Sequence, residues 1–384
     1  MQDIFIIGSK GIPGHYGGFE TFVDKLTEYH KNNNNLKYHV ACKGKENGEF
    51  SYHNARCFTI KVPEIGSAQA IYYDVEALRQ TIQYIKENKI KHPIVYILAC
   101  RIGPFMKYFS DAIHALGGVL YLNPDGHEWK RAKWSYPVRK YWKLSEEQMV
   151  KYADFIICDS VNIERYIQED YKKYSPKTTY IAYGAETKRS PLSDDDPKFK
   201  GWLEENGLKE KEYYLIVGRF VPENNFETII KEFMKSKTKK DLAIITTKNT
   251  PLLKEIEKSL HFTKDKRIKF VGTVYDQDLL MKIREQAYGY IHGHEVGGTN
   301  PSLLEALSST QLNLLLDVPF NKEVGKQAVL YWKKDDGSLA SLLNRAELFS
   351  DDELNNYDLM SSKRIIGFYN WNLISDKYSG VFTR

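Results

Sequence analysis

The chain has 384 residues, which at roughly 100–200 residues per domain predicts about two domains. Hydrophobic residues make up 42% and charged residues 27% of the chain, and these values exclude a disordered chain, a collagen and a disulfide-stapled miniprotein. The 55 Lys and Arg against 50 Asp and Glu give a net charge of +5, which is too weak by itself to indicate nucleic-acid binding.

Short apolar runs alternate with amphipathic helical patterns in the first half of the chain. The apolar runs lie at 3–8, 38–43, 56–62, 93–100, 118–123, 154–159 and 178–184, and the helical patterns lie near 19–31, 68–88, 104–116, 136–152 and 161–173. Continuous apolar strands separated by helices predict a parallel sheet that is covered on both faces. We therefore expect a Rossmann-like domain over residues 1–187.

The polar segment 188–201, with two prolines and three consecutive aspartates, predicts a linker or a surface loop. The alternation then restarts, with runs at 213–220, 242–247, 268–274, 288–293, 312–318 and 328–332 and helical patterns at 226–236, 252–260, 277–287 and 300–309. The fold class is therefore α/β, with a second doubly wound, Rossmann-like domain over 202–365. A last helical stretch covers 351–384.

Targeting, cysteine and metal signals are weak. The first apolar run, at 4–7, is far shorter than the core of a signal peptide, and no apolar run is long enough to span a bilayer. The four cysteines form no C-x-x-C pair and are interpreted as free thiols of a reducing cytoplasm. No ligand spacing indicates a metal site, so we expect neither a metal nor another cofactor.

In open α/β sheets ligands bind outside the carboxyl ends of the strands, so the residues that follow the predicted strands are the candidates for a site. The first such loop, GSKGIPGHYGG at 8–18, has five glycines and opens a helix. Its backbone can approach an anion closely, which makes Gly17 and Gly18 candidates for donor binding. A plain flexible loop is the alternative, since the segment is neither G-x-G-x-x-G nor a Walker loop.

Two stretches of the second half predict a phosphate site. Arg219 directly follows a strand, where it can fork onto phosphate oxygens or pair with Glu223 nearby. The turn HGHEVGGTNPS at 292–302 opens a helix that Thr299 or Asn300 can cap. The backbone N–H groups around this helix start predict a diphosphate site. The residues expected to bind the diphosphate are Gly298, Thr299, Asn300 and Ser302. Glu305, one turn further, either accepts hydrogen bonds from sugar hydroxyls or favours the helix dipole.

Polar residues also follow three strands of the first half. Asp125 and His127 come after the run at 118–123, Asp159 after FIIC, and Tyr183 after TYIA. We expect these side chains to line a ligand site, where one of them positions or deprotonates a hydroxyl group. The alternatives are a structural role for His127 and helix capping at residue 161 for Asp159.

Six basic residues stand against one acid between 128 and 143, and aromatic residues interleave with them. This mixture favours binding to an anionic membrane surface over binding to nucleic acid. The alternative is a solvated helix that binds neither. The residues expected at the membrane are Lys130, Arg131, Lys133, Trp134, Arg139 and Lys140.

Taken together, the stretches GSKGIPGHYGGFETFVDKL, NPDGHEWKRAKW, VGRFVPENN and HEVGGTNPSLLEAL resemble the GT-B glycosyltransferases of family 4. More narrowly, they resemble bacterial rhamnosyltransferases of streptococcal capsule and cell-wall polysaccharide assembly. The closing YNWNLISDKYSGVF is similar to that family's C-terminal helix, which implies that 366–384 returns to the first domain. The implied architecture is GT-B, with the acceptor bound by the first domain and the donor by the second.

The resemblance implies a retaining transfer of L-rhamnose from dTDP-rhamnose to a sugar on an undecaprenyl diphosphate lipid, forming a β-1,4 linkage. The implied location is the inner face of the plasma membrane. The sequence departs from the broad family in two places, because Asn224 replaces a common Lys and Gly297 stands where an acid is usual. Glu295 is the candidate replacement for that acid. These departures leave open a UDP-sugar donor, a sugar-nucleotide epimerase or a catalytically degenerate binding module.

Overall fold

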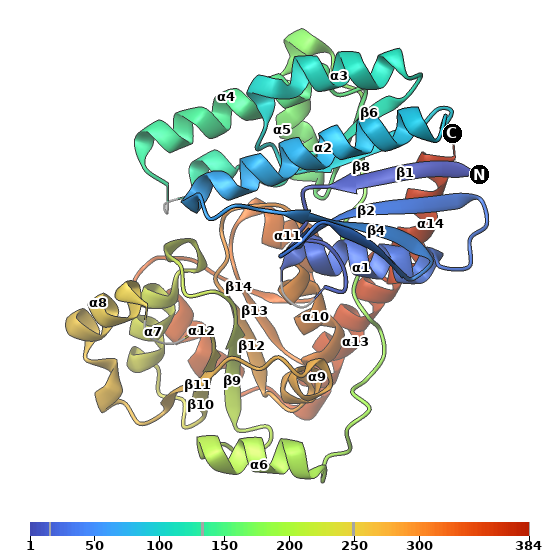
Figure 1. The fold of residues 1–384 in the computed structure, drawn as a ribbon. Helices are drawn as coiled ribbons and strands as arrows, with labels where there is room; N and C mark the ends of the chain where they lie inside the picture. Colours follow the sequence, from blue (N-terminus) through green and yellow to red (C-terminus); the bar gives the residue numbers. More distant parts are fainter. Residues whose placement is uncertain (15–16, 132–133, 248–249, 384) are drawn as a thin grey trace. The chain divides into compact units, whose positions relative to one another are not determined.

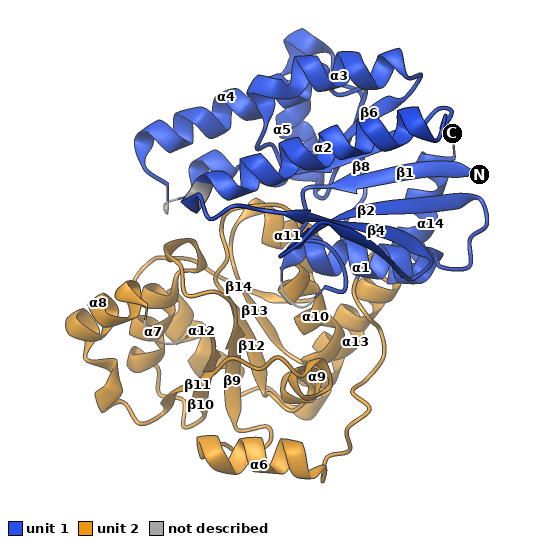
Figure 2. Cartoon of the chain, in the orientation of Figure 1, with its two compact units in different colours: residues 1–184, 371–384 blue, residues 185–370 orange. Residues whose placement is uncertain are grey.

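The structure, a computed structural model, describes residues 1–14, 17–131, 134–247 and 250–383 (Figure 1). The chain divides into two compact units (Figure 2). Unit 1 comprises residues 1–184 and 371–384, and unit 2 comprises residues 185–370. Each unit is built on its own sheet, as the alternation of apolar runs and helical patterns predicts.

Unit 1 contains an eight-stranded sheet in the order β3-β4-β2-β1-β5-β6-β7-β8. The central strand β5 is buried along its whole length, as expected of a parallel strand that is covered on both faces. Only the edge strand β3 is antiparallel, and it pairs with β4. The strands are β1 (Gln2–Ile7), β2 (Leu36–Gly44), β3 (Gly48–Tyr52), β4 (Ala55–Lys61), β5 (Ile94–Leu98), β6 (Val119–Asn123), β7 (Phe155–Cys158) and β8 (Thr178–Tyr180).

The helices of unit 1 cover both faces of this sheet. They are α1 (Gly18–His30), α2 (Gln69–Glu87), α3 (Met106–Ala115), α4 (Tyr136–Tyr152), α5 (Val161–Asp170) and α14 (Trp371–Phe382). Two short 3-10 helices, η3 (Glu128–Lys130) and η4 (Lys172–Tyr174), follow β6 and α5. The C-terminal α14 packs into the core, because Tyr378 lies 5.2 Å from Phe22 between ring centroids and 3.3 Å from Tyr96 between hydroxyl oxygens.

Unit 2 contains a six-stranded, all-parallel sheet in the order β11-β10-β9-β12-β13-β14. The strands are β9 (Tyr213–Val217), β10 (Asp241–Ile245), β11 (Ile268–Gly272), β12 (Gly289–His292), β13 (Asn313–Leu316) and β14 (Leu330–Trp332). The helices are α6 (Pro197–Asn206), α7 (Phe226–Lys235), α8 (Pro251–Leu260), α9 (Gln277–Glu285), α10 (Pro301–Ser309), α11 (Pro319–Gly325), α12 (Ser338–Ala346) and α13 (Asp351–Phe368). Apolar clusters on both faces bury the strands between these helices.

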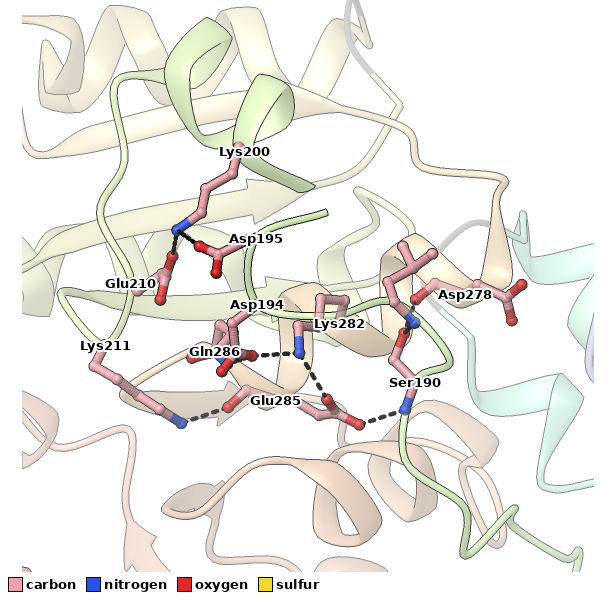
Figure 3. A network of polar contacts seen from close by, with 11 residues as sticks. Ser190, Asp194, Asp195, Lys200, Glu210, Lys211, Asp278, Lys282, Glu285 and Gln286 are labelled. Atoms are coloured by element: carbon pink, nitrogen blue, oxygen red, sulfur yellow. Dashed lines mark hydrogen bonds and ion pairs between the residues drawn. The ribbon is translucent and has the colours of Figure 1, made fainter. Parts of the chain in front are cut away.

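The segment 188–201 is fastened to unit 2 (Figure 3). Asp194 accepts from the Nζ of buried Lys282 at 2.5 Å and from the Nε2 of Gln286 at 2.6 Å. The Ser190 backbone N–H donates to Glu285 at 2.6 Å, and its hydroxyl donates to the Asp278 carbonyl at 2.7 Å. The predicted linker therefore lies along α9 and ends in α6 as part of unit 2.

The compact units begin and end at different residues from the predicted domains. The first break falls between Gly184 and Ala185, rather than at 187, because the Ala185 N–H already donates to the Tyr369 carbonyl of unit 2 at 2.7 Å. Residues 185–201 thus belong to unit 2, and so does the end of α13, which continues beyond 365. The final helical stretch is two helices, α13 and α14, and only α14 belongs to unit 1.

All four cysteines are free thiols, as the sequence predicts, and all four are buried. Among the described residues, no helix has the length and hydropathy needed to cross a membrane.

Candidate functional site

The loop after β1 is shaped by close backbone packing. A side chain at Gly8, where φ is 102°, would collide with the Leu98 carbonyl of β5, so only glycine fits. The N–H groups of Lys10 and Gly14 donate to Glu20 at 2.8 Å and to Asp24 at 2.6 Å, both on α1. Two amides of this loop are therefore already bound by carboxylates of α1.

The predicted donor residues Gly17 and Gly18 lie at the start of α1. Gly17 has φ 126°, and a side chain there would collide with the Glu20 carboxylate. No atom comes within 4 Å of a side-chain carbon placed on Gly18. The conformation of the loop thus explains Gly17 by itself, and a donor-binding role for either glycine stays a prediction.

Arg101 is a cation of the unit 1 edge that the sequence reasoning missed. Its Nη1 donates to the Gly8 carbonyl at 2.8 Å and lies 3.1 Å from Asp74 Oδ2, an ion pair in which Asp74 is fully buried. Burial raises the pKa of Asp74, and Arg101 opposes that rise. Arg101 ties the ends of β1 and β5 together. Its position directly after the run at 93–100 was the available signal.

Asp125 and His127 follow β6 in the left-handed conformation, with φ of 58° and 48°. Such values are uncommon for residues other than glycine and concentrate at functional sites. The Asp125 N–H donates to Asn123 Oδ1 at 2.9 Å, and burial raises the pKa of its carboxyl, opposed by Arg131. His127 is 8% exposed, and burial together with Lys130 and Lys143 lowers its pKa to about 4. The imidazole is therefore neutral at physiological pH.

Asp159 and Tyr183 lie beside Asp125, because β6, β7 and β8 are neighbours in the sheet. Both residues are buried, and the Tyr183 ring packs 5.3 Å from Phe22. Burial raises the pKa of Tyr183 well above its usual value, and the charges of Asp159 and Asp125 add to this rise. Tyr183 therefore stays protonated and can donate a hydrogen bond but not act as a base. Ser160, not Asp159, caps α5 by accepting from the Asn162 N–H at 3.1 Å.

The basic stretch after β6 divides into buried and exposed parts. Arg131 is only 8% exposed, and its Nε lies 2.5 Å from Glu128 Oε2, while Trp134 Nε1 donates to Glu128 Oε1 at 2.9 Å. The membrane role expected of Arg131 is therefore at odds with its burial. Lys133 lies outside the described residues.

The exposed part comprises Lys130, Lys140 and Tyr136, and the last of these is 68% exposed. Lys140 Nζ lies 4.6 Å from the Tyr136 ring centroid, and Arg139 is half-buried with its Nε donating to the Trp134 carbonyl at 3.0 Å. Two further exposed aromatic residues, Phe105 and Tyr108, lie just before and within the neighbouring α3. Exposed cations and an exposed aromatic ring thus lie on η3 and at the start of α4.

In unit 2, Arg219 follows β9 and is exposed. The ion pair with Glu223 does not form: Glu223 is buried, and the Arg219 side chain makes no ion pair with any residue that the structure describes. Asn224 Nδ2 donates to the Arg219 carbonyl at 2.7 Å, and Asn224 Oδ1 lies 2.7 Å from His294 Nδ1. Asn224 therefore joins the loops after β9 and β12, which flank each other in the sheet.

The start of α10 is capped by Asn300. Its side chain accepts from the N–H groups of Ser302 at 2.9 Å and Leu303 at 3.4 Å, and Pro301 occupies the first turn. The Ser302 amide, which was predicted to bind a diphosphate, is thus already bound by this cap, so a ligand would meet the preceding turn and the positive end of the helix. The Ser302 hydroxyl lies 3.1 Å from the Tyr290 hydroxyl and Thr299 is buried, whereas Gly298 is half-buried.

Glu305 makes an ion pair that the sequence did not predict. Its Oε2 lies 2.6 Å from Nη2 of Arg284, a buried residue of α9, although the Glu305 side chain is itself 37% exposed. The Arg284 guanidinium also donates to the Ser302 hydroxyl at 3.3 Å. A buried charge that loses its partner is costly, and Glu305 is the partner of the buried Arg284 guanidinium. Glu305 therefore stabilises the fold whether or not it also binds a ligand.

The turn before α10 explains the glycine at 297. Gly297 has φ 136°, a conformation that side chains rarely adopt. The acid that the resemblance leads one to expect there would be strained in this turn. Glu295 lies nearby, half-buried and ion-paired with Lys334, which follows β14. Its carboxylate is therefore partly neutralised.

Among the residues that the structure describes, no group of three or more His, Cys, Asp or Glu gathers as metal ligands. A shallow groove of about 480 Å³ lies elsewhere on unit 2, between α6 and the start of α9, with Trp202 and Tyr275 in its lining. None of the predicted donor residues lines that groove.

The sequence of the first half of the chain and the fold of the whole chain are similar to those of known proteins. Residues 1–186 match a family model described as a domain of unknown function (DUF1972). A comparison with curated proteins found no match. The match covers all of unit 1 that precedes α14, together with the first two residues of unit 2.

Solved structures match the whole chain. Sucrose-phosphate synthase from Thermosynechococcus elongatus has a TM-score of 0.76 at 16% identity, covering 100% of this chain and 98% of that one. A trehalose-6-phosphate protein from E. coli bound with UDP-2-fluoro glucose has 0.74 at 10%, covering 100% and 99%. HepE from Anabaena in complex with UDP has 0.68 at 11%, covering 100% of both. The chain therefore has the GT-B fold of glycosyltransferases.

Proposed function

We propose that the chain is a glycosyltransferase that takes its sugar from a sugar nucleotide. The observation that carries the proposal is the exposed guanidinium of Arg219, which forms no ion pair with any described residue and lies at the carboxyl end of β9, beside the turn that opens α10. A guanidinium and a helix start are both suited to a diphosphate. Proteins of the same fold are described with UDP or UDP-2-fluoro glucose bound, which supports this ligand class.

The proposed chemistry is charge stabilisation of a leaving diphosphate. Arg219, the amides of the turn at 297–300 and the dipole of α10 oppose the negative charge that grows as the bond from the anomeric carbon to the diphosphate breaks. The acceptor hydroxyl forms the new bond on the same face and gives its proton to the departing phosphate oxygen. This route retains the anomeric configuration without a protein nucleophile. Asn224 fixes the Arg219 loop by two hydrogen bonds.

The finer proposal concerns the substrates. On the sequence resemblance, the donor is dTDP-rhamnose and the acceptor is a sugar on an undecaprenyl diphosphate lipid. Asp125, Asp159, His127 and Tyr183 form the acceptor side in unit 1, with Tyr183 as a donor of a hydrogen bond because of its raised pKa. The role proposed for Glu295 is to orient the donor sugar, together with Lys334. Glu305 holds Arg284 and, through its remaining oxygen, the nucleoside sugar.

A membrane-bound acceptor requires the protein to meet the bilayer surface. Lys130 and Lys140 supply charge, and Tyr136 with Tyr108 supplies exposed rings suited to the lipid headgroup region. We therefore propose peripheral attachment to the inner face of the plasma membrane through α3 and α4. A Lys130→Glu, Lys140→Glu double variant should lose binding to vesicles containing anionic lipid; binding that persists and ignores salt would contradict this attachment.

The activity is tested by incubating the purified full chain with dTDP-rhamnose, with UDP-sugars and with a lipid-linked sugar acceptor. We expect a glycosylated lipid from dTDP-rhamnose, with the anomeric configuration of the donor. Arg219→Ala should abolish transfer, whereas Arg345→Ala, an exposed arginine at the end of α12, should not. A rearranged sugar without transfer would indicate an epimerase, and binding without turnover a binding module.

Metal independence is a separate prediction, because Arg219 and the helix start are proposed to neutralise the diphosphate alone. EDTA should leave the transfer rate unchanged. Complete loss of transfer that Mg²⁺ restores would show that a cation shares this task.

A further inference from the structure

A cluster of polar groups, buried at Glu146 and Tyr171 and half-buried at its other members, lies beside His127 in unit 1. We call it the Tyr166 cluster, and its members come from η3, α4, α5 and the start of η4: Trp129, Lys143, Glu146, Tyr166 and Tyr171. Lys143 is at its centre, because its Nζ lies 4.8 Å from the ring centroids of Trp129, Tyr166 and Tyr171 alike. The arrangement brings together residues up to 42 positions apart in the chain.

The Tyr166 hydroxyl joins the members of the cluster. It accepts from Lys143 Nζ at 2.5 Å and from Trp129 Nε1 at 3.2 Å, and it donates to the Glu146 carboxylate. Tyr171 also donates to Glu146, whose side chain is buried. Burial raises the pKa of Glu146, while these tyrosines and Lys143 oppose the rise.

A network of this kind contributes little by itself to the stability of the fold. Taking Glu146 and part of the Lys143 side chain out of water costs free energy that their attraction offsets only with good geometry, and apolar residues often stabilise a fold as well. Fully satisfied polar networks do, however, fix side chains in one arrangement. The residue that this network holds in place is therefore the informative one.

That residue is His127. Its ring lies 4.2 Å from the Tyr166 ring between centroids, at an interplanar angle of 47°, and 6.1 Å from the Trp129 ring. Among the residues that the structure describes, the charged groups that act on the imidazole include Lys130 of η3, Lys143 of α4 and Asp170 of α5. The two lysines favour the neutral ring, which can accept a hydrogen bond from a hydroxyl, and Asp170 opposes them.

We propose that Tyr166 is a positioning residue for His127: its hydroxyl, held by Lys143, Trp129 and Glu146, fixes the phenol ring against the imidazole and so sets the imidazole edge offered to the acceptor hydroxyl. This inference rests on the proposed function, which puts His127 on the acceptor side. Without the hydroxyl, Lys143 and Trp129 lose their shared acceptor. Lys143 then keeps its ion pairs with Asp170 at 3.1 Å and with Glu146 at 3.6 Å, so its ammonium group shifts toward these carboxylates.

The first test reads the imidazole directly and needs no activity. Nuclear magnetic resonance of histidine-labelled full chain should give a His127 titration midpoint near 4, matching its lowered pKa. Tyr166→Phe should move the His127 ring-proton shifts and raise the midpoint. Tyr174→Phe is the matched control, because its hydroxyl donates at 2.8 Å to Glu147, the residue after Glu146, outside the cluster. Unchanged His127 signals in Tyr166→Phe would overturn the proposal.

A second variant guards against misfolding of the first. Lys143→Met keeps an unbranched apolar side chain under the rings but removes the donor to Tyr166 and one cation beside His127. It should also raise the midpoint. A midpoint that stays near 4 in folded Lys143→Met would overturn the proposal as well.

The activity arm separates positioning from the reaction itself. With wild-type protein active, Tyr166→Phe should lower kcat about tenfold or raise the acceptor KM, with donor affinity unchanged, and should shift the acid limb of the pH profile; Tyr174→Phe should match wild type. Equal kinetics in both variants would overturn the proposal. Should wild-type protein transfer no sugar, the proposed function fails, while the resonance signals still decide the role of Tyr166.

Discussion

Among the described residues, burial lowers the pKa of His30, His39, His127 and His292, and this makes the stability of the fold depend on pH. His292, the last residue of β12, is buried on all sides, and burial together with neighbouring His294 lowers its pKa to about 3. The pKa of His127 is lowered to about 4. In the unfolded chain both titrate near 6.5, so the unfolded state binds more protons at mildly acidic pH. Their contribution to stability is complete above pH 6.5 and is lost as the pH falls toward 3.

The thermal midpoint should therefore fall as the pH is lowered from 7 to 4. Each histidine contributes a slope of about 1.4 kcal/mol per pH unit within its own window. His292→Gln should flatten the pH dependence of unit 2, whereas His261→Asn, at an exposed position, should leave it as in wild type. Melting curves across this range measure the effect. A dependence as steep in His292→Gln as in wild type would show that other groups dominate.

For single residues, the sequence predicts which positions lie at the ends of strands better than it predicts which side chains they contact. Arg219, Asp125, His127 and Asp159 all follow strands, which is a local pattern. Arg284 as the partner of Glu305, and Tyr166 as the neighbour of His127, depend on contacts between helices that no local pattern records. Gly297 looked like a missing acid, although its φ of 136° gives it a conformational reason.

At the scale of elements, the start of α10 offers a test that separates folding from ligand binding. Asn300→Asp keeps the cap, since aspartate caps as well as asparagine. It also adds a negative charge where the diphosphate is proposed to lie. We expect a thermal midpoint close to wild type and donor affinity reduced at least about tenfold, since nearby like charges cost several kcal/mol near a protein surface.

Thr250→Asp is the matched control, because Thr250 caps α8 in the same way, by accepting from the Leu253 N–H at 3.2 Å. It should change neither donor affinity nor the midpoint appreciably. Equal donor affinity in Asn300→Asp and wild type, measured by calorimetry, would remove the start of α10 from the diphosphate site.

The strand β3 and the helix α6 were not predicted for physical reasons, whereas the helix α12 could have been predicted from the sequence. The edge strand β3 is mostly exposed and so carries no apolar run. In α6, Pro197 suggested a loop, but it occupies the first turn after the Asp196 cap, where proline is tolerated. The nine residues of α12 do carry a helical apolar pattern that was overlooked, with Leu339, Leu342 and Leu343 buried. Parallel strands and long helices were predicted because their burial repeats regularly.

At the scale of the whole molecule, the contacts of segment 188–201 with α9 make this segment part of unit 2. The chain therefore passes between the units before this segment begins. The chain passes from one unit to the other at the peptide bonds 184–185 and 370–371, and Ala185 and Asn370 form a β-bridge within unit 2. The polar segment that looked like a flexible linker is therefore held, and it should resist proteases.

Limited trypsin digestion measures this. Asp194→Ala removes the acceptor of Lys282 and Gln286, at a cost of about 1 kcal/mol, and should speed cleavage after Lys188 and Arg189 about fivefold. Asp195→Ala is the control, because that side chain is 96% exposed and lies 3.5 Å from Lys200. Equal cleavage rates in wild type and Asp194→Ala would mean that the segment opens independently of this contact.

The central claim is that Arg219 and the start of α10 bind the diphosphate of a sugar nucleotide. Isothermal calorimetry with dTDP-rhamnose and with UDP-sugars on the full chain tests it most directly. The account predicts saturable binding of dTDP-rhamnose that Arg219→Ala weakens roughly 10- to 150-fold, the loss of one charge-assisted contact of about 1.5–3 kcal/mol, and that Arg345→Ala leaves intact. No binding of any sugar nucleotide, or equal affinity in wild type and Arg219→Ala, would contradict it.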